Sequence, residues 1–249
     1  MFKNVLIISD NSYLCGKFIE IIVKKKIIES LFSVGISPYS NIEDFKDLKG
    51  YTPTVFNLKD SNDIDIIKTS FDLIFSLHCK QIFPFELVNS IKCINIHPGF
   101  NPINRGWYPQ VFSIIHKLPI GATIHEIDDK LDHGLIIDRA EVLKTSFDTS
   151  QSLYNKILSK EIELLEINIE NIINNCYKTF PAENEGNLFL KKDFNNLLEI
   201  QLNEIVIVRD FIDRIRALTH GNLKNAYFID ENTNKKVFVT INLSPELDG

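Results

Sequence analysis

The stretch NIHPGFNPINRGWYPQVFSIIHKLPIGATIHEIDDKLD, residues 95–132, begins at the end of an apolar run and continues through a loop rich in Pro and Gly. Asn95 and His97 lie two positions apart at the end of that run. Because side chains two apart on a strand point to the same face, one strand end would present an amide and an imidazole together. Asp132 comes shortly before Gly134, which permits a sharp turn. We therefore expect the carboxylate of Asp132 to meet the imidazole of His97.

Each of these side chains also has a purely structural interpretation. An isolated His after a strand is more often packed or solvated than catalytic. Asn95 could cap the strand end, and Asp132 could accept backbone N–H groups in a turn. These interpretations explain poorly why the three residues occur together with a loop stiffened at both ends. The stiffening loop residues are Pro98, Gly99, Arg105, Gly106 and Pro109.

Apolar runs and helical periodicities alternate along the first part of the chain. The expected elements are strands at residues 4–9, 31–36 and 72–77 and helices at residues 13–25 and 64–69. This alternation predicts an α/β fold with a doubly wound, mostly parallel sheet. Ligands bind beyond the carboxyl ends of the strands in such sheets, so the loops that begin at Asp10, His78 and His97 should converge on one cleft.

The remainder of the chain predicts a long helix and then a smaller module. Residues 150–176 carry apolar side chains at spacings of three and four, as in an amphipathic helix that ends a catalytic domain. The later elements expected are a helix at residues 208–218 and strands at 226–229 and 237–242, joined by a turn at 230–236. We therefore divide the chain into a catalytic domain, residues 1–178, and a small α+β module ending in a β-hairpin, residues 179–249.

The hairpin of this module carries enough apolar side chains for a two-fold interface, so we expect a homodimer through it. These side chains are Tyr227, Phe228, Phe238, Val239 and Ile241.

Composition limits the classes of function. The chain has 249 residues, 44% of them hydrophobic, and can bury one substantial core. Its net charge of -6 argues against a large nucleic-acid surface, which needs clustered Lys and Arg. The four cysteines form no CxxC pair, and the sequence shows neither a leader nor an 18-residue apolar span, so we expect a reduced cytoplasmic protein without a membrane partner. The histidines lack the spacing of a metal site, and no metal is expected.

Three motifs resemble the core of the formyltransferases that use 10-formyltetrahydrofolate. They are Asn-x-His from Asn95, Arg-Gly-x-x-Pro from Arg105 and Asp-x-Gly from Asp132, in the order and spacing of that family. The Pro-Gly pair after His97 resembles the nucleotide-sugar branch, especially enzymes acting on dTDP-4-amino-4,6-dideoxyglucose, more than the purine or initiator-tRNA branches. The sequence at residues 9–14, which replaces a Gly-rich loop, fits the same branch. The implied fold is a formyltransferase-like variant of the Rossmann architecture.

The resemblance implies transfer of a formyl group from 10-formyltetrahydrofolate to the amine of a dTDP-linked amino-dideoxy sugar, a step of surface-polysaccharide (O-antigen, lipopolysaccharide) synthesis. Such a reaction needs a fixed donor at the carbonyl oxygen, and we assign this role to Asn95. It also needs a group that moves a proton near neutral pH, a role that fits His97. Asp132 would fix the tautomer of His97 and favour its protonated form. With no Ser or Cys placed as a nucleophile, we expect direct transfer.

Further contacts are implied by the resemblance. The predicted folate contacts, mainly through the main chain, are His78, Cys79, Gln81, Ile82, Phe83, Asp128 and Asp129. The predicted nucleotide-sugar contacts are Asp10, Asn11, Ser12, Lys80, Pro98, Gly99, Asn104, Arg105, Trp107 and Tyr108. Cations and helix N–H groups suit a diphosphate, and the aromatic pair suits a thymine or a sugar ring. Lys80 could equally be a solvated loop lysine, and the aromatic pair could equally be a packing anchor.

Other functions remain open at this point. The same site could use a 3-amino sugar, a GDP- or UDP-linked sugar or a purine precursor as the acceptor. Water could replace the amine, which would make the protein a hydrolase that releases formate. A non-catalytic folate-binding or nucleotide-binding regulator is a third possibility, although the intact set of Asn95, His97 and Asp132 argues against it.

Overall fold

Seven strands form one sheet in the order β3-β2-β1-β4-β5-β7-β8 in the computed structural model, which describes residues 1–28 and 31–246. Five strands are parallel to one another: β1 Val5–Ser9, β2 Phe32–Ile36, β3 Thr54–Val55, β4 Leu73–Leu77 and β5 Lys92–His97. Two follow in antiparallel pairing: β7 Gly121–Glu126 and β8 Ile136–Glu141. The prediction of a mostly parallel sheet is confirmed, but the antiparallel edge was not foreseen.

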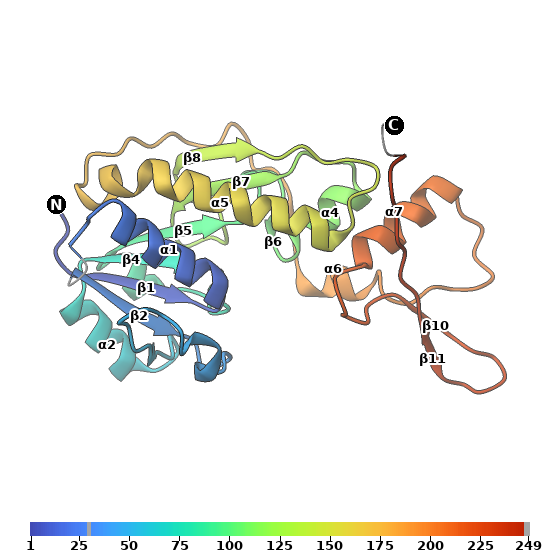
Figure 1. Ribbon diagram of the computed structural model, residues 1–249, viewed down its shortest axis with the longest axis horizontal. Helices are drawn as coiled ribbons and strands as arrows, with labels where there is room; N and C mark the ends of the chain where they lie inside the picture. The colour runs from blue at the N-terminus through green and yellow to red at the C-terminus, as the bar shows by residue number, and fades with distance from the viewer. Residues whose placement is uncertain (29–30, 247–249) are drawn as a thin grey trace.

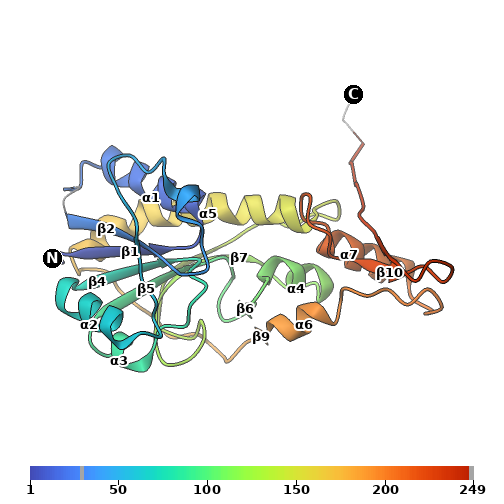
Figure 2. The ribbon, with the colours of Figure 1, turned by 90° about the horizontal axis from the view of Figure 1, so that it is seen from below.

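Helices cover both faces of the sheet (Figures 1 and 2). On one face lie α1 Ser12–Lys24 and α5 Ser150–Ile173, and on the other lie α2 Ser61–Ser70 and α3 Phe85–Val88. The alternation of β1 accounts for this layering, because Val5 and Ile7 belong to one buried cluster and Leu6 and Ile8 to the other. A short 3-10 helix, η2 Ile42–Phe45, follows β2. The expected helices and strands of this part are present, although α5 ends three residues earlier than predicted.

The antiparallel edge follows from the connection between β5 and β7. After β5 the chain makes a short strand, β6 Arg105–Gly106, and a helix of only seven residues, α4 Pro109–Ile115. This helix packs against α5 and against the C-terminal helix α7 Val208–Leu218. Because it lies at the end of the sheet instead of crossing its face, the chain returns along β5 in the opposite direction.

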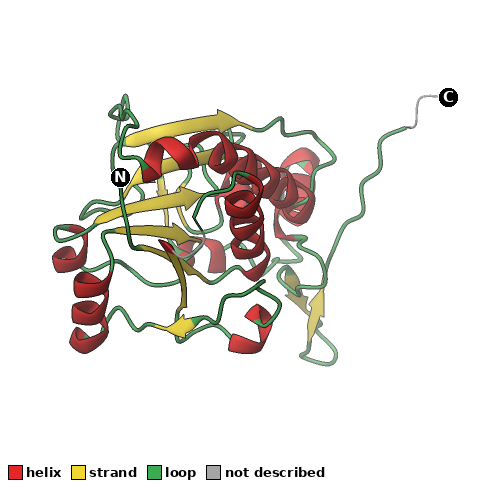
Figure 3. Ribbon diagram, turned by 60° about the vertical axis from the view of Figure 1, so that its left-hand side comes forward, coloured by secondary structure: helices red, strands yellow, loops and turns green. Residues whose placement is uncertain are grey.

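The C-terminal module lies beside the N-terminal end of α5 (Figure 1). It contains β9 Leu188–Phe189, α6 Lys191–Asn195, α7 and a hairpin of β10 Tyr227–Ile229 and β11 Lys236–Phe238. The helix and the hairpin are confirmed, but β11 begins one residue earlier than predicted and ends at Phe238. The chain then leaves the hairpin as an extended segment (Figure 3). Since β9 pairs with β6, the proposed division at residues 178 and 179 stays a prediction.

Exposed apolar side chains gather in this module. Val239 and Ile241, which were expected at an interface, are partly buried against the core of the same chain. The largest exposure lies instead in the segment before α7, where Ile205 is fully exposed and Ile207 is 70% exposed. In the described part of the chain, no helix is both long and apolar enough to cross a bilayer.

Candidate active site

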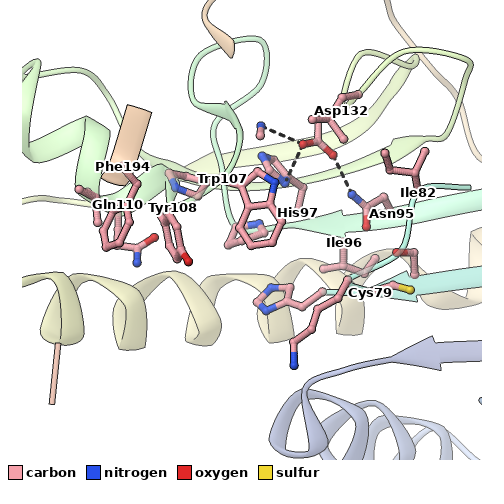
Figure 4. Close-up of a pocket in the computed structure, with 18 of the residues that line it drawn as sticks. Cys79, Ile82, Asn95, Ile96, His97, Trp107, Tyr108, Gln110, Asp132 and Phe194 are labelled. Atoms are coloured by element: carbon pink, nitrogen blue, oxygen red, sulfur yellow. Dashed lines mark hydrogen bonds and ion pairs between the residues drawn. The ribbon is translucent and has the colours of Figure 1, made fainter. Parts of the chain in front are cut away.

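A cavity of about 670 Å³ opens at the carboxyl ends of β4 and β5 (Figure 4). Its walls come from the segments that follow these strands, from the loop between β7 and β8, and from α5. The C-terminal module completes it with Phe194, Ala217, His220, Leu223 and Asn225. The cavity therefore lies at the junction of the sheet with the smaller module, and its volume is typical of a ligand pocket.

Asp132 is fixed in one wall of the cavity by two hydrogen bonds (Figure 4). Its Oδ2 accepts from the backbone N–H of Gly106 at 3.0 Å, and its Oδ1 accepts from Asn95 Nδ2 at 3.2 Å. The residue adopts a left-handed backbone conformation with φ of 47°, which Asp tolerates better than most residues. Burial opposes ionisation, but the nearby imidazoles of His97 and His125 and the hydrogen bonds lower the pKa of Asp132 well below its ordinary value. The side chain is therefore a carboxylate at neutral pH.

His97 lies at the end of β5, almost completely buried. Its Nδ1 is 3.7 Å from Asp132 Oδ2, and its Nε2 is 3.4 Å from the carbonyl oxygen of Asn104. Burial lowers the pKa of His97 and outweighs the charge of Asp132, which raises it. Asp132 does favour the protonated form, as expected, but burial has the larger effect and the net pKa shift is downward. The imidazole is neutral at pH 7 and is ready to accept a proton.

Asn95 has a neighbour that the sequence did not assign. The antiparallel register sets His125 of β7 directly opposite Asn95, with His125 Nε2 at 3.3 Å from Asn95 Nδ2. His125 Nδ1 lies 2.7 Å from the carbonyl of Glu126, which can only accept, so Nδ1 carries the hydrogen and Nε2 is the acceptor. Asn95 thus directs its two N–H bonds at His125 and Asp132. A developing oxyanion is a stronger acceptor than a neutral imidazole and would draw one of these bonds to itself.

A second network lies where α5 meets the end of β4. His78 Nε2 is 2.8 Å from Glu161 Oε1, and His78 Nδ1 is 3.1 Å from the hydroxyl of Tyr154. Asn11 Nδ2 donates to the same hydroxyl at 3.1 Å. Both His78 and Tyr154 line the cavity, so this network forms part of its floor.

Most of the residues predicted from the sequence line this one cavity, although their roles stay predictions. The lining includes Asn95, His97, Asp132, His78, Cys79, Lys80, Gln81, Ile82, Phe83, Pro98, Trp107, Tyr108, Asp128 and Asp129. The side-chain amide of Gln81 is hydrogen-bonded within the protein, since it accepts from the N–H of Leu58 and donates to the carbonyl of Phe56. Burial raises the pKa of the Cys79 thiol to about 12, which disfavours a thiolate nucleophile.

Six residues predicted to contact the nucleotide sugar are not in the lining: Asp10, Asn11, Ser12, Gly99, Asn104 and Arg105. Four of them, Asp10, Asn11, Asn104 and Arg105, have partners within the protein. Asp10 accepts from Ser37, Ser40 and the N–H of Lys80, and Asn11 caps α1 by accepting from the N–H of Leu14.

Arg105 and Asn104 also have partners within the protein. Arg105 is buried, with its guanidinium 3.7 Å from the carboxylate of Glu185, and Asn104 donates to the carbonyl of Pro119. Gly99 passes so close to His97 that an added Cβ would lie 2.4 Å from Nε2. Arg105, Asn104 and Gly99 therefore support the cavity walls without lining the cavity themselves.

Other lining residues were missed by the sequence analysis. One is Phe194 of α6, whose ring packs against that of the predicted Tyr108 with a centroid distance of 4.1 Å and a tilt of 35° (Figure 4). Ser150 Oγ lies 3.0 Å from His220 Nδ1 and accepts from Gln110 at 3.2 Å. No spacing in the sequence links these residues, because they come from separate elements of two modules. His125 lies two positions from Thr123, so the alternation of the strand could place these two polar side chains on one face but could not show that His125 reaches the cavity.

The arrangement can bind a carbonyl compound and move a proton beside it. It offers an amide donor, a neutral imidazole and a carboxylate within one wall. Among residues 1–28 and 31–246, no group of three or more His, Cys, Asp and Glu side chains could hold a metal ion.

Comparison with known proteins gives family matches for both parts of the chain. Residues 39–168 match the formyl transferase family, and residues 193–245 match the N-formyltransferase dimerization C-terminal domain. The chain is 43% identical over 208 residues to the dTDP-4-amino-4,6-dideoxyglucose formyltransferase of Mycobacterium tuberculosis, covering 84% of this chain and 88% of that protein.

Solved structures give the same result. A 4-N formyltransferase from Francisella tularensis superposes with a TM-score of 0.88 at 43% identity, covering 98% of this chain and 99% of that one. A sugar N-formyltransferase from a Shewanella species superposes with a TM-score of 0.87 at 38% identity, covering 99% of each chain.

Proposed function

This chain belongs to the formyl transferase family, and we propose that it transfers the formyl group of 10-formyltetrahydrofolate to the amine of a dTDP-linked amino-dideoxy sugar. The acceptor we propose is dTDP-4-amino-4,6-dideoxyglucose, the sugar named for the Mycobacterium tuberculosis relative that is 43% identical. The product would serve surface-polysaccharide synthesis. One observation carries the proposal: Asn95, His97 and Asp132 meet in one wall of a cavity of about 670 Å³.

The folate supplies the formyl group, and the chain's own residues handle the charge and the proton. Asn95 donates an N–H to the carbonyl oxygen as that oxygen becomes negative. Neutral His97 accepts the proton that the attacking amine loses as its C–N bond forms. His97 then gives this proton to the folate nitrogen as the bond to that nitrogen breaks. Asp132 stays ionised and stabilises the transient imidazolium from 3.7 Å.

The proposed ligand positions follow the walls of the cavity. We place the folate against the segment that follows β4, where Cys79, Ile82 and Phe83 line the cavity. We place the sugar nucleotide toward α5 and the C-terminal module, with Lys80 as the cation for its diphosphate. Arg105 is a weaker choice for that role, because its guanidinium is buried beside Glu185.

A direct assay by mass spectrometry tests the reaction. Wild type is expected to convert dTDP-4-amino-4,6-dideoxyglucose, in the presence of 10-formyltetrahydrofolate, into a product heavier by one formyl group. His97→Asn should lose this activity, whereas His116→Asn should keep it, because His116 stacks on Phe112 outside the cavity lining. If only the 3-amino isomer is formylated, that isomer is the acceptor, and the proposed class of dTDP-linked amino sugars still holds. Formate release without any acceptor would instead identify a hydrolase.

We also propose that the chain forms a homodimer through its C-terminal module. The match of residues 193–245 to a dimerization domain supports this, as do the exposed side chains of Ile205, Ile207 and Val208 at the start of α7 and of Phe238 in the hairpin. Light scattering on the wild type should give twice the subunit mass, and Ile207→Asp should give a monomer. A wild-type mass of one subunit would overturn the proposal.

A further inference from the structure

Glu161 is a fully buried carboxyl group in a helix face that is otherwise apolar. It lies on the stripe of α5 that includes Leu153, Ile157 and Leu165, spaced by four residues. Its Oε1 contacts His78 Nε2 at 2.8 Å, while its buried Oε2 has no hydrogen-bond partner. A buried carboxyl group with one oxygen lacking a hydrogen bond lowers the stability of the folded state, whereas an apolar side chain at this position would not. Its position behind a residue of the cavity suggests a functional reason for that cost.

His78 connects this carboxyl group to the cavity. The residue follows β4 in a left-handed backbone conformation with φ of 53°, uncommon for a residue other than Gly. That conformation turns the imidazole toward α5, where it lies between Glu161 on one side and Tyr154 on the other. The ring is therefore held at both nitrogens, and both His78 and Tyr154 line the cavity.

The direction of each hydrogen bond in this network follows from its fixed ends. Asn11 caps α1 through its Oδ1, so its Nδ2 must be the group that faces Tyr154 at 3.1 Å and His78 Nδ1 at 3.4 Å. Burial, together with the charge of Glu161, raises the pKa of Tyr154 to about 12, so the hydroxyl keeps its hydrogen. With Nε2–H donating to Glu161, His78 Nδ1 is an acceptor and Tyr154 donates to it.

One additional proton reverses the last of these bonds. When the proton resides on His78, or on Glu161 Oε1 so that this oxygen donates to His78 Nε2, His78 Nδ1 carries a hydrogen and donates to the Tyr154 oxygen. The hydrogen of Tyr154 must point elsewhere, and the cavity is the side left open to it. The same proton also cancels the negative charge of the His78–Glu161 pair. Both changes favour an anion in the cavity.

We propose that Glu161 is a positioning residue that, acting through His78, turns the Tyr154 hydroxyl toward the diphosphate of the acceptor as the pair gains a proton. The inference rests on the proposed function, because a nucleotide sugar supplies that diphosphate. Binding of the nucleotide sugar then takes up a proton, and its affinity rises as the pH falls.

Other charged or titratable groups near His78 need to be distinguished from this pair. They are His97 on β5, whose charge interacts with that of His78, and His220, whose ring lies 5.5 Å from that of Tyr154. Asp10 and Lys80 lie on the adjoining loops, where Asp10 accepts from the backbone N–H of Lys80. His97→Asn removes the first of these while leaving the His78–Glu161 pair intact, so the proton uptake should survive in that variant.

Isothermal titration with dTDP-glucose tests the proposal. This ligand has no amine, and both phosphates of its diphosphate stay ionised near neutral pH, so any proton taken up belongs to the protein. Titrations of the wild type in two buffers of different ionisation enthalpy should show net proton uptake, with affinity rising by at most tenfold for each unit decrease in pH. Glu161→Gln should abolish the uptake and flatten the pH dependence. Glu163→Gln, an exposed position on the same helix paired with Lys160, should behave as the wild type.

Tyr154→Phe provides a second variant that keeps the volume of the side chain. It should bind dTDP-glucose about tenfold more weakly at low pH, the loss expected for one hydrogen bond to a charged group. Proton uptake that persists unchanged in a folded Glu161→Gln or Tyr154→Phe variant would overturn the inference. Wild-type binding without proton uptake would also overturn it and leave the proposed function intact. A complete absence of wild-type binding would count against the acceptor class itself.

Discussion

Replacing Asp132 by Asn removes the charge of the carboxylate together with one of its two acceptor oxygens, so the loss worked out from the charge alone is a lower bound. The substitution keeps the size of the side chain, and Asn tolerates the left-handed backbone at this position. The charge removed lies 3.7 Å from His97 Nδ1, and at an effective dielectric constant of about 20 two unit charges at that distance attract by about 4.5 kcal/mol. This attraction exists only while His97 carries a proton, so its loss raises the transition state more than the ground state.

The expected size of the effect depends on how far the proton has moved. Half of the transfer at the transition state corresponds to about 2.3 kcal/mol, or about 50-fold in kcat, and complete transfer corresponds to about 2000-fold. Initial rates at saturating concentrations of both substrates measure this quantity. Asp138→Asn is the matched control, because Asp138 lies on the outer strand β8, accepts from Asn168 of α5 and does not line the cavity. A folded Asp132→Asn enzyme that loses less than about fivefold in kcat would refute the electrostatic role.

Three further predictions concern the same wall of the cavity. His125→Phe removes the acceptor that orients Asn95, and kcat should fall about tenfold while KM for the folate changes little, as steady-state kinetics would show. Gly99→Ala places a methyl group 2.4 Å from His97 Nε2, so activity should fall more steeply than the melting temperature; equal losses would contradict this. The pKa of His97 is lower in the folded than in the unfolded protein, so the unfolded state binds the proton first as the pH drops below about 6.5. Stability should therefore decrease toward acid pH, and thermal melts of His97→Asn should show a smaller decrease.

Much of the fold could be predicted because it depends on local periodicity. The alternation of apolar residues in β1 and the helical spacing in α1 and α5 are properties of short segments, and the structure contains these elements within a few residues of the predicted bounds. The antiparallel strand β7 could not be predicted in this way. Its direction depends on where the short helix α4 packs, and that contact joins residues far apart in the sequence.

The sequence by itself determined that Asn95 and His97 share one face of a strand end, because a period of two residues is a property of the strand alone. It also placed Asp132 in a turn after that strand. Only the tertiary structure decided that His125 orients Asn95 and that Glu161 lies behind His78. Those pairs depend on strand register and helix packing, which are set by the burial of the whole core instead of by the residues near each side chain. The same reason explains why burial, and not the charge of Asp132, sets the protonation state of His97.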